Sequence, residues 1–157
     1  MSAAPKLEKK LKVTLVGDRT IRTERTFDAP REKVWKANTD PKLLAQWWGR
    51  GKKMTVERFE LQRGGHWRFV VNEGKDAQGF EGRFREVTPQ ERIVQTFEWD
   101  GMPGHVMVET VTFEDLGAKT RIVTESLFHT AEECAGMDME VGLIDSYEAL
   151  ERLLASM

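Results

Sequence analysis

Apolar and polar residues alternate over most of the chain from residue 59 to residue 128, and this spacing predicts antiparallel β-strands. Three hairpins fit the pattern: residues 59–69 with a turn at 63–65, residues 79–99 with a turn at 88–90, and residues 105–128 with a turn around 116–117. Each turn contains glycine or proline, the residues that tight turns favour. The pattern therefore predicts about six strands, each with one apolar face.

Side-chain chemistry predicts the register of two hairpins. In the first, Leu61 is expected opposite Trp67 and Phe59 opposite Phe69, which keeps the large apolar residues on one face. The same register sets Glu60 opposite Arg68 on the other face, so that one register satisfies both faces. In the third, one register satisfies both faces, and its expected pairs are Phe113 with Ile122, Glu114 with Arg121, Val111 with Thr124, and Glu109 with Ser126. A slip of one residue would turn every side chain to the other face.

The second hairpin has a single apolar face on both of its strands. The residues of this face are Phe80, Phe84, Ile93, Phe97 and Trp99. Gly82 lies on the same face between two phenylalanines, and because it has no side chain we expect it to leave a gap in the sheet.

The segments before these hairpins predict another strand and two short helices. Residues 19–27 are rich in β-branched side chains and form a strand, to which residues 11–18 offer a possible partner. Residues 28–38 form a short helix with Pro30 in its first turn. A second helix starts with Asp40 as its N-cap and Pro41 at its first position, and it ends at Gly49.

The C-terminal segment is helical. Thr130 and Glu133 form a capping-box signature for a short helix that is interrupted at Gly136. From Asp138 onward, small and apolar residues recur at helical spacing, namely Met139, Leu143, Ser146, Leu150, Leu153 and Leu154. This spacing predicts a long amphipathic helix.

An antiparallel sheet with one apolar face needs a cover, and only the last helix is long enough to provide it. We therefore predict an α+β fold in which a curved antiparallel sheet of about six to seven strands grips a C-terminal helix. Residues 19–157 are expected to form one domain, and residues 1–18 a lead-in that includes a possible extra strand.

Composition excludes several functional classes. Charged residues make up 32% of the chain, but their signs are mixed and the formal net charge is −2, which does not favour nucleic acid as a partner. The sequence has no long apolar run and one cysteine, Cys134, so we expect no membrane insertion and a cytoplasmic location. The three histidines lack metal-ligand spacing, and we expect no metal or other cofactor.

The order of elements and several motifs together resemble the helix-grip proteins of the START-related superfamily, also called SRPBCC or Bet v-like. The motifs are "FDAPREKVWKANTDPKLLAQWWG", "ELQRGGHWRF", "REVTPQERIVQTFEW", "VTFEDLG", "TRIVTESLF" and "GLIDSYEALERLLA". The branch that they resemble most is named after the activator of heat-shock-protein-90 ATPase. The resemblance implies a helix-grip fold that binds lipids, polyketides or flavonoid-like compounds between sheet and helix. Two residues depart from the family pattern: Leu143, where tryptophan is frequent, and Glu109, where an apolar residue is usual.

Aromatic residues are the main candidates for contact with such a ligand. Adjacent helical residues point about 100° apart, so Trp47 and Trp48 are expected to differ, one closing the core and the other lying at the cavity mouth. Strand aromatics either fill the core or line a cavity, and the pattern leaves both possibilities open. The full candidate set is Trp35, Trp47, Trp48, Phe59, Trp67, Phe69, Phe97, Trp99, Glu109, Ser126, Leu143 and Tyr147.

Glu109 is the candidate with the most distinctive chemistry. A carboxylate on an apolar face is costly unless it is paired or neutralised. Either the strand alternation slips near Met107, or Glu109 lies near water at the sheet end, or it is a polar anchor or a proton acceptor with a raised pKa beside Thr124 and Ser126. Three functions stay open. A binder of a small hydrophobic ligand needs only the aromatic lining, whereas a cyclase or hydrolase would use Glu109 as acid or base. The family name alone suggests a chaperone-associated protein, and a homodimer is possible.

Overall fold

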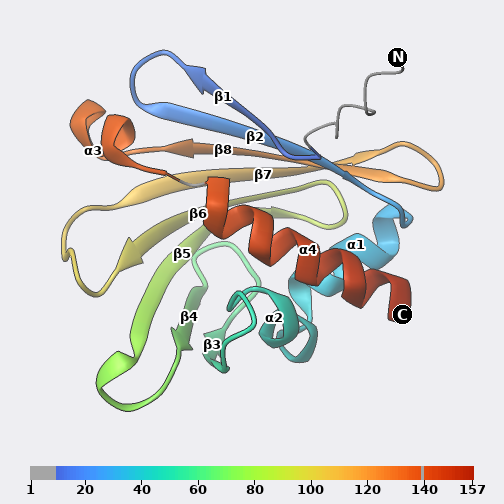
Figure 1. Cartoon of the computed structure of the whole chain (residues 1–157), viewed down its shortest axis with the longest axis horizontal. Helices are drawn as coiled ribbons and strands as arrows, with labels where there is room; N and C mark the ends of the chain where they lie inside the picture. The colour runs from blue at the N-terminus through green and yellow to red at the C-terminus, as the bar shows by residue number, and fades with distance from the viewer. Residues whose placement is uncertain (1–9, 139) are drawn as a thin grey trace, which may run out of the picture.

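The computed structural model describes residues 10–138 and 140–157 and contains an eight-stranded antiparallel sheet with four α-helices (Figure 1). The strands are β1 Lys12–Val16, β2 Thr20–Phe27, β3 Met54–Phe59, β4 His66–Val71, β5 Gln78–Thr88, β6 Arg92–Trp99, β7 Met107–Asp115 and β8 Thr120–Leu127. The helices are α1 Arg31–Thr39, α2 Pro41–Trp47, α3 Ala131–Gly136 and α4 Glu140–Ser156, with a 3₁₀ turn, η1, at Gly74–Asp76. Residues 1–9 of the expected lead-in, and Met139 of the expected helical stripe, lie outside the described residues.

The strand order is β1-β2-β8-β7-β6-β5-β4-β3, so β1 and β3 are the edges of the sheet. The long helix α4 crosses one face of this sheet, and α1 and α2 pack beside it (Figure 1). The predicted α+β helix-grip fold is confirmed. The sheet has eight strands rather than six to seven because it includes β1. No helix in the described part of the chain is both long and apolar enough to span a membrane.

The two helices before β3 begin and end close to where the sequence placed them. Asp40 caps α2, since its side chain accepts a hydrogen bond of 2.9 Å from the backbone N–H of Lys42, and Pro41 is the first helical residue. Pro30 precedes α1 as its N-cap residue instead of lying in its first turn. The two helices meet at Asp40, which turns the chain so that the end of α2 faces the inner side of the sheet.

The register of the third hairpin is confirmed in all four expected pairs. Phe113 lies opposite Ile122, Glu114 opposite Arg121, Val111 opposite Thr124 and Glu109 opposite Ser126. Because opposed residues share a face, this register turns Glu109 toward the covered side of the sheet.

The expected register of the first hairpin is wrong. Trp67 lies opposite Phe59 instead of Leu61, and Phe69 lies opposite Val56. The cause lies in the loop: Gly64 donates its backbone N–H to Phe84 at 2.7 Å, and Phe84 donates to Gly65 at 2.9 Å. The loop is thus held against β5, and its turn closes between Gln62 and Gly65, where Gly65 donates its backbone N–H to Gln62 at 2.8 Å. Trp67 therefore pairs two residues earlier on β3 than expected, and Arg68 lies opposite Arg58 instead of Glu60.

The core lies between the inner face of the sheet and α4. Side chains on α4 that are at least nine-tenths buried are Ser146, Tyr147, Leu150, Leu153 and Leu154. They pack in one cluster with residues from α1 and the central strands, including Val34, Phe27, Phe113 and Ile122. The helix therefore presents an apolar stripe to the sheet that is interrupted by the hydroxyl groups of Ser146 and Tyr147.

Candidate functional site

The two adjacent tryptophans at the end of α2 have different surroundings. Trp47 is buried and donates its indole N–H to the backbone oxygen of Ala37 at 2.9 Å, so it closes the core beside Tyr147. Trp48 is half-buried, and its ring is 5.0 Å from the ring of Phe69 and 5.4 Å from that of Phe80.

Trp48 is the centre of an aromatic cluster built from β4, β5 and β6. Its ring also lies 6.5 Å from the rings of both Trp67 and Phe97. We call the residues Trp48, Trp67, Phe69, Phe80 and Phe97 the aromatic wall. They meet because the alternation on each strand turns these rings inward, while the end of α2 delivers Trp48 against them. Sequence analysis placed Phe80 on this face but did not select it as a site residue.

The remaining aromatic candidates lie around this wall. Phe59 stacks on Phe69 with a ring separation of 6.1 Å, and Trp35 packs edge-to-face on Phe113 at 5.2 Å. Trp99 is 37% exposed at the sheet rim, where its indole N–H donates to the side chain of Gln78 at 2.7 Å. The structure thus brings Phe59 to the wall and places Trp35 and Trp99 elsewhere.

The gap expected at Gly82 is filled. The indole of Trp67 lies over this position and donates its N–H to the backbone oxygen of Thr96 at 3.2 Å. A Cβ on Gly82 would lie 2.6 Å from the Trp67 indole nitrogen and 1.8 Å from the Thr96 oxygen. Because Gly82 has no side chain, the indole ring of Trp67 can pack directly against the sheet.

Glu109 lies on the covered face with two neutral partners. Gln95 donates to its Oε1 at 3.3 Å, and the Ser126 hydroxyl donates to its Oε2 at 3.4 Å. Burial raises the pKa of the Glu109 carboxyl above its ordinary value, and the hydrogen bonds from Gln95 and Ser126 lower it only in part. Glu109 as a whole is half-buried, so part of its surface is accessible although its carboxyl is surrounded by protein.

Tyr147 on α4 faces the same region from the helix side. Its side chain is 5% exposed and forms a hydrogen bond with Thr124. Burial raises the pKa of the Tyr147 phenol to about 12; the Thr124 bond and the positive charge of Arg25 lower it, whereas the negative charge of Glu109 raises it. Glu109, Thr124, Ser126 and Tyr147 therefore form one polar group between sheet and helix.

Sequence analysis missed a buried arginine in this region. Arg25 is 3% exposed on β2, and its Nη2 is 3.1 Å from Glu151 Oε2 on α4, while its guanidinium lies 5.0 Å from the centre of the Phe27 ring. Within the described residues, Arg25 Nε and the Thr23 hydroxyl have no hydrogen-bond partner. Strand parity could have found both, because Thr23 and Arg25 share a face with Ile21 and Phe27, which are buried.

Leu143 and the histidines belong neither to the aromatic wall nor to the polar group around Glu109. Leu143 is half-buried and packs against the main core cluster. His66 contacts Glu81, and His105 contacts Glu133, at the molecular surface. The described residues contain no group of three or more histidine, cysteine, aspartate or glutamate side chains arranged to hold a metal ion.

The raised pKa of Glu109 gives a pH-dependent stability with a definite sign. A carboxyl whose pKa is higher in the folded than in the unfolded chain stabilises the fold when protonated, and this contribution is lost as the pH rises from its ordinary value of 4.5 through the raised value. We therefore expect the free energy of unfolding of Glu109→Gln to increase, relative to that of the unsubstituted protein, as the pH is raised. Urea unfolding between about pH 4 and pH 8 measures this difference. A stability difference that stays constant with pH would contradict the burial of the carboxyl.

A curved sheet that holds one long helix, with a polar group and an aromatic wall on the enclosed face, defines a helix-grip protein. The chain belongs to the family described as "Activator of Hsp90 ATPase homolog 1-like protein", whose model matches residues 28–155. The resemblance inferred from the sequence is thereby confirmed. No curated protein matches the chain.

Solved structures of similar proteins support the fold. A protein from Rhodobacter sphaeroides is 24% identical, with a TM-score of 0.85 over 94% of this chain and 99% of that one. A protein from Staphylococcus epidermidis is 26% identical, with a TM-score of 0.78 over 92% and 94% of the two chains. A protein from Chromobacterium violaceum is 26% identical, with a TM-score of 0.71 over 87% and 97%. All three are similar over nearly their whole length.

Proposed function

We propose that this protein binds a small apolar or aromatic molecule, such as a lipid, a polyketide or a flavonoid-like compound, between the sheet and α4. The observation that carries the proposal is the position of Glu109: a carboxyl held by neutral partners on the same enclosed face as the aromatic wall. An apolar lining with a few convergent polar groups is typical of small-molecule sites.

The partial exposure of several side chains on the covered face of the sheet supports the same proposal. The Glu109 carboxyl is surrounded by protein strongly enough to raise its pKa, yet the residue as a whole is only half-buried. Gln95, Phe97 and Trp48 are half-buried as well, although they also face the inside of the fold. In our proposal these partly accessible side chains line the ligand site.

Each part of the lining has a role in this proposal. The aromatic wall offers flat surfaces to an apolar or ring-containing ligand. Phe97 is the next inward residue after Gln95 on β6, so the wall continues directly into the polar group around Glu109. The unpartnered hydroxyl of Thr23 and the Nε–H of Arg25 are further groups toward which a polar substituent could turn.

Binding of flavone, an uncharged aromatic polycycle, tests the proposal. We expect saturable quenching of tryptophan emission and saturable heat in calorimetry. Trp48→Leu should weaken binding roughly tenfold, because a ring at the centre of the wall is lost and a stacked aromatic pair contributes about 0.5–1.5 kcal/mol beyond its buried area. Trp99→Leu is the matched control and should leave the affinity within about twofold, since Trp99 lies at the rim.

Two outcomes would contradict the binding proposal. Linear quenching without saturation would indicate adsorption to the surface. Equal losses in Trp48→Leu and Trp99→Leu would mean that the wall does not contact the ligand.

A second candidate function is catalysis in the same space, favoured by the raised pKa of Glu109. A carboxyl with a raised pKa can serve as a general acid, and its conjugate base can remove a proton from a substrate. Glu109→Gln is expected to change the affinity for flavone only modestly, and no reaction of flavone is expected in either protein. For a cyclase or hydrolase substrate, the same change would reduce turnover roughly 100-fold or more.

The cellular setting that we propose is a reducing one, such as the cytoplasm. Cys134 is the only cysteine in the sequence, and it is buried as a free thiol between α3 and the ends of the strands.

A further inference from the structure

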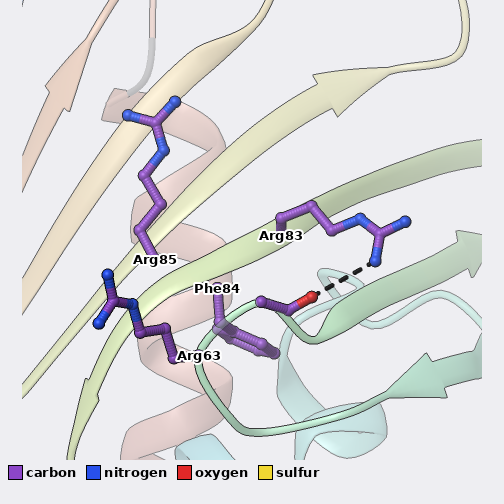
Figure 2. Close-up of a pocket in the computed structure, with 5 residues that line it drawn as sticks. Arg63, Arg83, Phe84 and Arg85 are labelled. Carbon is purple, nitrogen blue, oxygen red and sulfur yellow. Dashed lines mark hydrogen bonds between the residues drawn. The ribbon is translucent and has the colours of Figure 1, made fainter.

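A shallow pocket of about 530 Å³, wide open to solvent, lies on the outside of the molecule, where the loop between β3 and β4 meets β5. Its lining contains three arginines, Arg63, Arg83 and Arg85, together with Gly64 and Phe84 (Figure 2). Pockets of about 300–1,000 Å³ are typical for small molecules. This pocket is separate from the aromatic wall and from Glu109, because the arginines are exposed and Glu109 faces the inside.

The backbone fixes the positions of these arginines. Gly64 donates its N–H to the Phe84 oxygen at 2.7 Å, which holds the loop carrying Arg63 against β5. Arg83 Nη1 donates to the Gly64 oxygen at 3.4 Å, shown as the dashed line in Figure 2. The ladder between β5 and β6 is irregular between Phe84 and Glu86, so Arg85 has no paired residue there.

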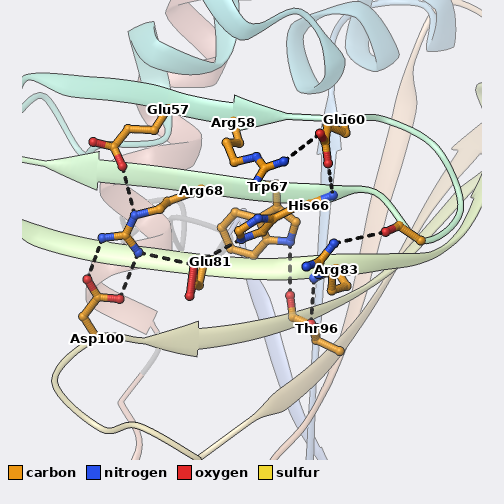
Figure 3. Close-up of polar contacts among 11 residues, drawn as sticks. Glu57, Arg58, Glu60, His66, Trp67, Arg68, Glu81, Arg83, Thr96 and Asp100 are labelled. Atoms are coloured by element: carbon orange, nitrogen blue, oxygen red, sulfur yellow. Dashed lines mark hydrogen bonds and ion pairs between the residues drawn. The ribbon is translucent and has the colours of Figure 1, made fainter.

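The outer face next to this pocket is neutralised by ion pairs. Arg68 lies 2.9 Å from Glu57 and 2.7 Å from Asp100, and Arg58 lies 2.9 Å from Glu60 (Figure 3). The hydrogen bonds from Arg68 lower the pKa of the Asp100 carboxyl. Salt bridges therefore balance the charges over β3, β4 and the start of β5.

The arginines of the pocket lack such partners. In the described part of the chain, no carboxylate lies within 4.0 Å of the guanidinium groups of Arg63, Arg83 or Arg85. Glu86, the nearest acidic residue along the strand, is paired with Arg92 at 3.0 Å. The guanidinium groups of Arg63 and Arg85 extend on the same side of the pocket, whereas that of Arg83 turns the other way toward the Gly64 oxygen (Figure 2). An anion between Arg63 and Arg85 would be attracted by both positive charges.

We propose that this pocket binds a small phosphate-bearing molecule. Guanidinium groups donate two parallel hydrogen bonds to phosphate oxygens, and groups from a loop and a strand approach such a ligand from more than one side. The site is distinct from the proposed ligand space between sheet and helix, and it does not depend on that proposal.

Pyrophosphate is the probe for a first experiment. We expect saturable shifts of the backbone amide signals of residues 63–65 and 83–85 in an NMR titration at constant ionic strength, and a weaker affinity at higher salt. The double variant Arg63→Gln/Arg85→Gln should lose about tenfold or more in affinity, because it loses charge-assisted hydrogen bonds. Arg121→Gln is the matched control, since Arg121 is similarly exposed but already paired with Glu114 at 3.0 Å, and it should bind as the unsubstituted protein does.

Three results would overturn the proposal. The first is an absence of saturable shifts at millimolar pyrophosphate. The second is unchanged affinity in the double variant, and the third is an equal loss in Arg121→Gln, which would indicate attraction to the overall charge of the molecule. Both variants change exposed side chains, and circular dichroism checks that they keep the fold.

Discussion

Replacing Gly82 with alanine is expected to lower the free energy of unfolding by about 3 kcal/mol or more. The new methyl group would lie 1.8 Å from the backbone oxygen of Thr96, a contact that cannot be relieved by rotating a side chain. It would also lie 2.6 Å from the indole nitrogen of Trp67, so the ring must move and its hydrogen bond to Thr96 is lost. The cost combines overpacking with a buried donor that has no acceptor.

Urea unfolding measures this loss, and a second glycine provides the control. Gly136 at the end of α3 has no atom within 4 Å of the position that a Cβ would take. Gly136→Ala should therefore change the free energy of unfolding by no more than about 0.5 kcal/mol. Similar values for the two variants would mean that the close approach of Trp67 to the sheet does not contribute to stability.

Gly82 also illustrates how far strand periodicity can be taken. The alternation placed Gly82 and Trp67 on the inner face, which the pairing of β4 with β5 bears out, since the two residues are opposite each other. It could not show that the indole turns across the glycine, because the direction of a ring depends on its rotamer and on the neighbouring strand. Periodicity predicts the face on which a residue lies and leaves open what fills the space there.

The two registers differ in what determines them. In the third hairpin, a shift of one residue would bury Glu114 and Arg121, so the sequence alone selects the register. In the first hairpin the observed shift is two residues, which keeps Phe59 and Trp67 on the inner face. Both registers keep these aromatic residues on one face, and the observed one is held by two backbone hydrogen bonds, from Gly64 to the distant Phe84 and from Phe84 to Gly65. Because these residues are far apart in the sequence, no local pattern predicts that they form hydrogen bonds.

The candidate site was predictable where register determined it. The predicted pairing of Glu109 with Ser126 is confirmed, since the two residues lie opposite each other on β7 and β8. Gln95, opposite Glu109 on β6, belongs to another hairpin, and its pairing with β7 was not predicted. Arg25 was not foreseen because the alternation of β2 was not followed residue by residue, although it places Arg25 on the same face as the buried Ile21 and Phe27. Trp99 lies at the rim because the helix does not cover the sheet that far. The alternation of residues along a strand cannot predict how much of the sheet a helix covers.

Leu150→Ala is the second substitution with a large expected effect, a loss of about 2–5 kcal/mol in the free energy of unfolding. Leu150 is 0% exposed and lies in the cluster that joins α4 to the inner face of the sheet. Alanine favours helix at least as strongly as leucine, so a loss of stability reports the missing packing and not a weaker helix.

Glu148 on the same helix is the control for Leu150. Its side chain is exposed, and Glu148→Ala should change the free energy of unfolding by no more than about 0.5 kcal/mol in the same urea experiment. Comparable losses in both variants would contradict the orientation of α4 that turns Leu150 and Tyr147 toward the sheet. Tyr147 lies one turn before Leu150 on α4, and the same orientation brings it to Thr124 and next to Glu109 on the sheet. A large loss confined to Leu150→Ala is therefore expected if the helix covers the candidate site as described.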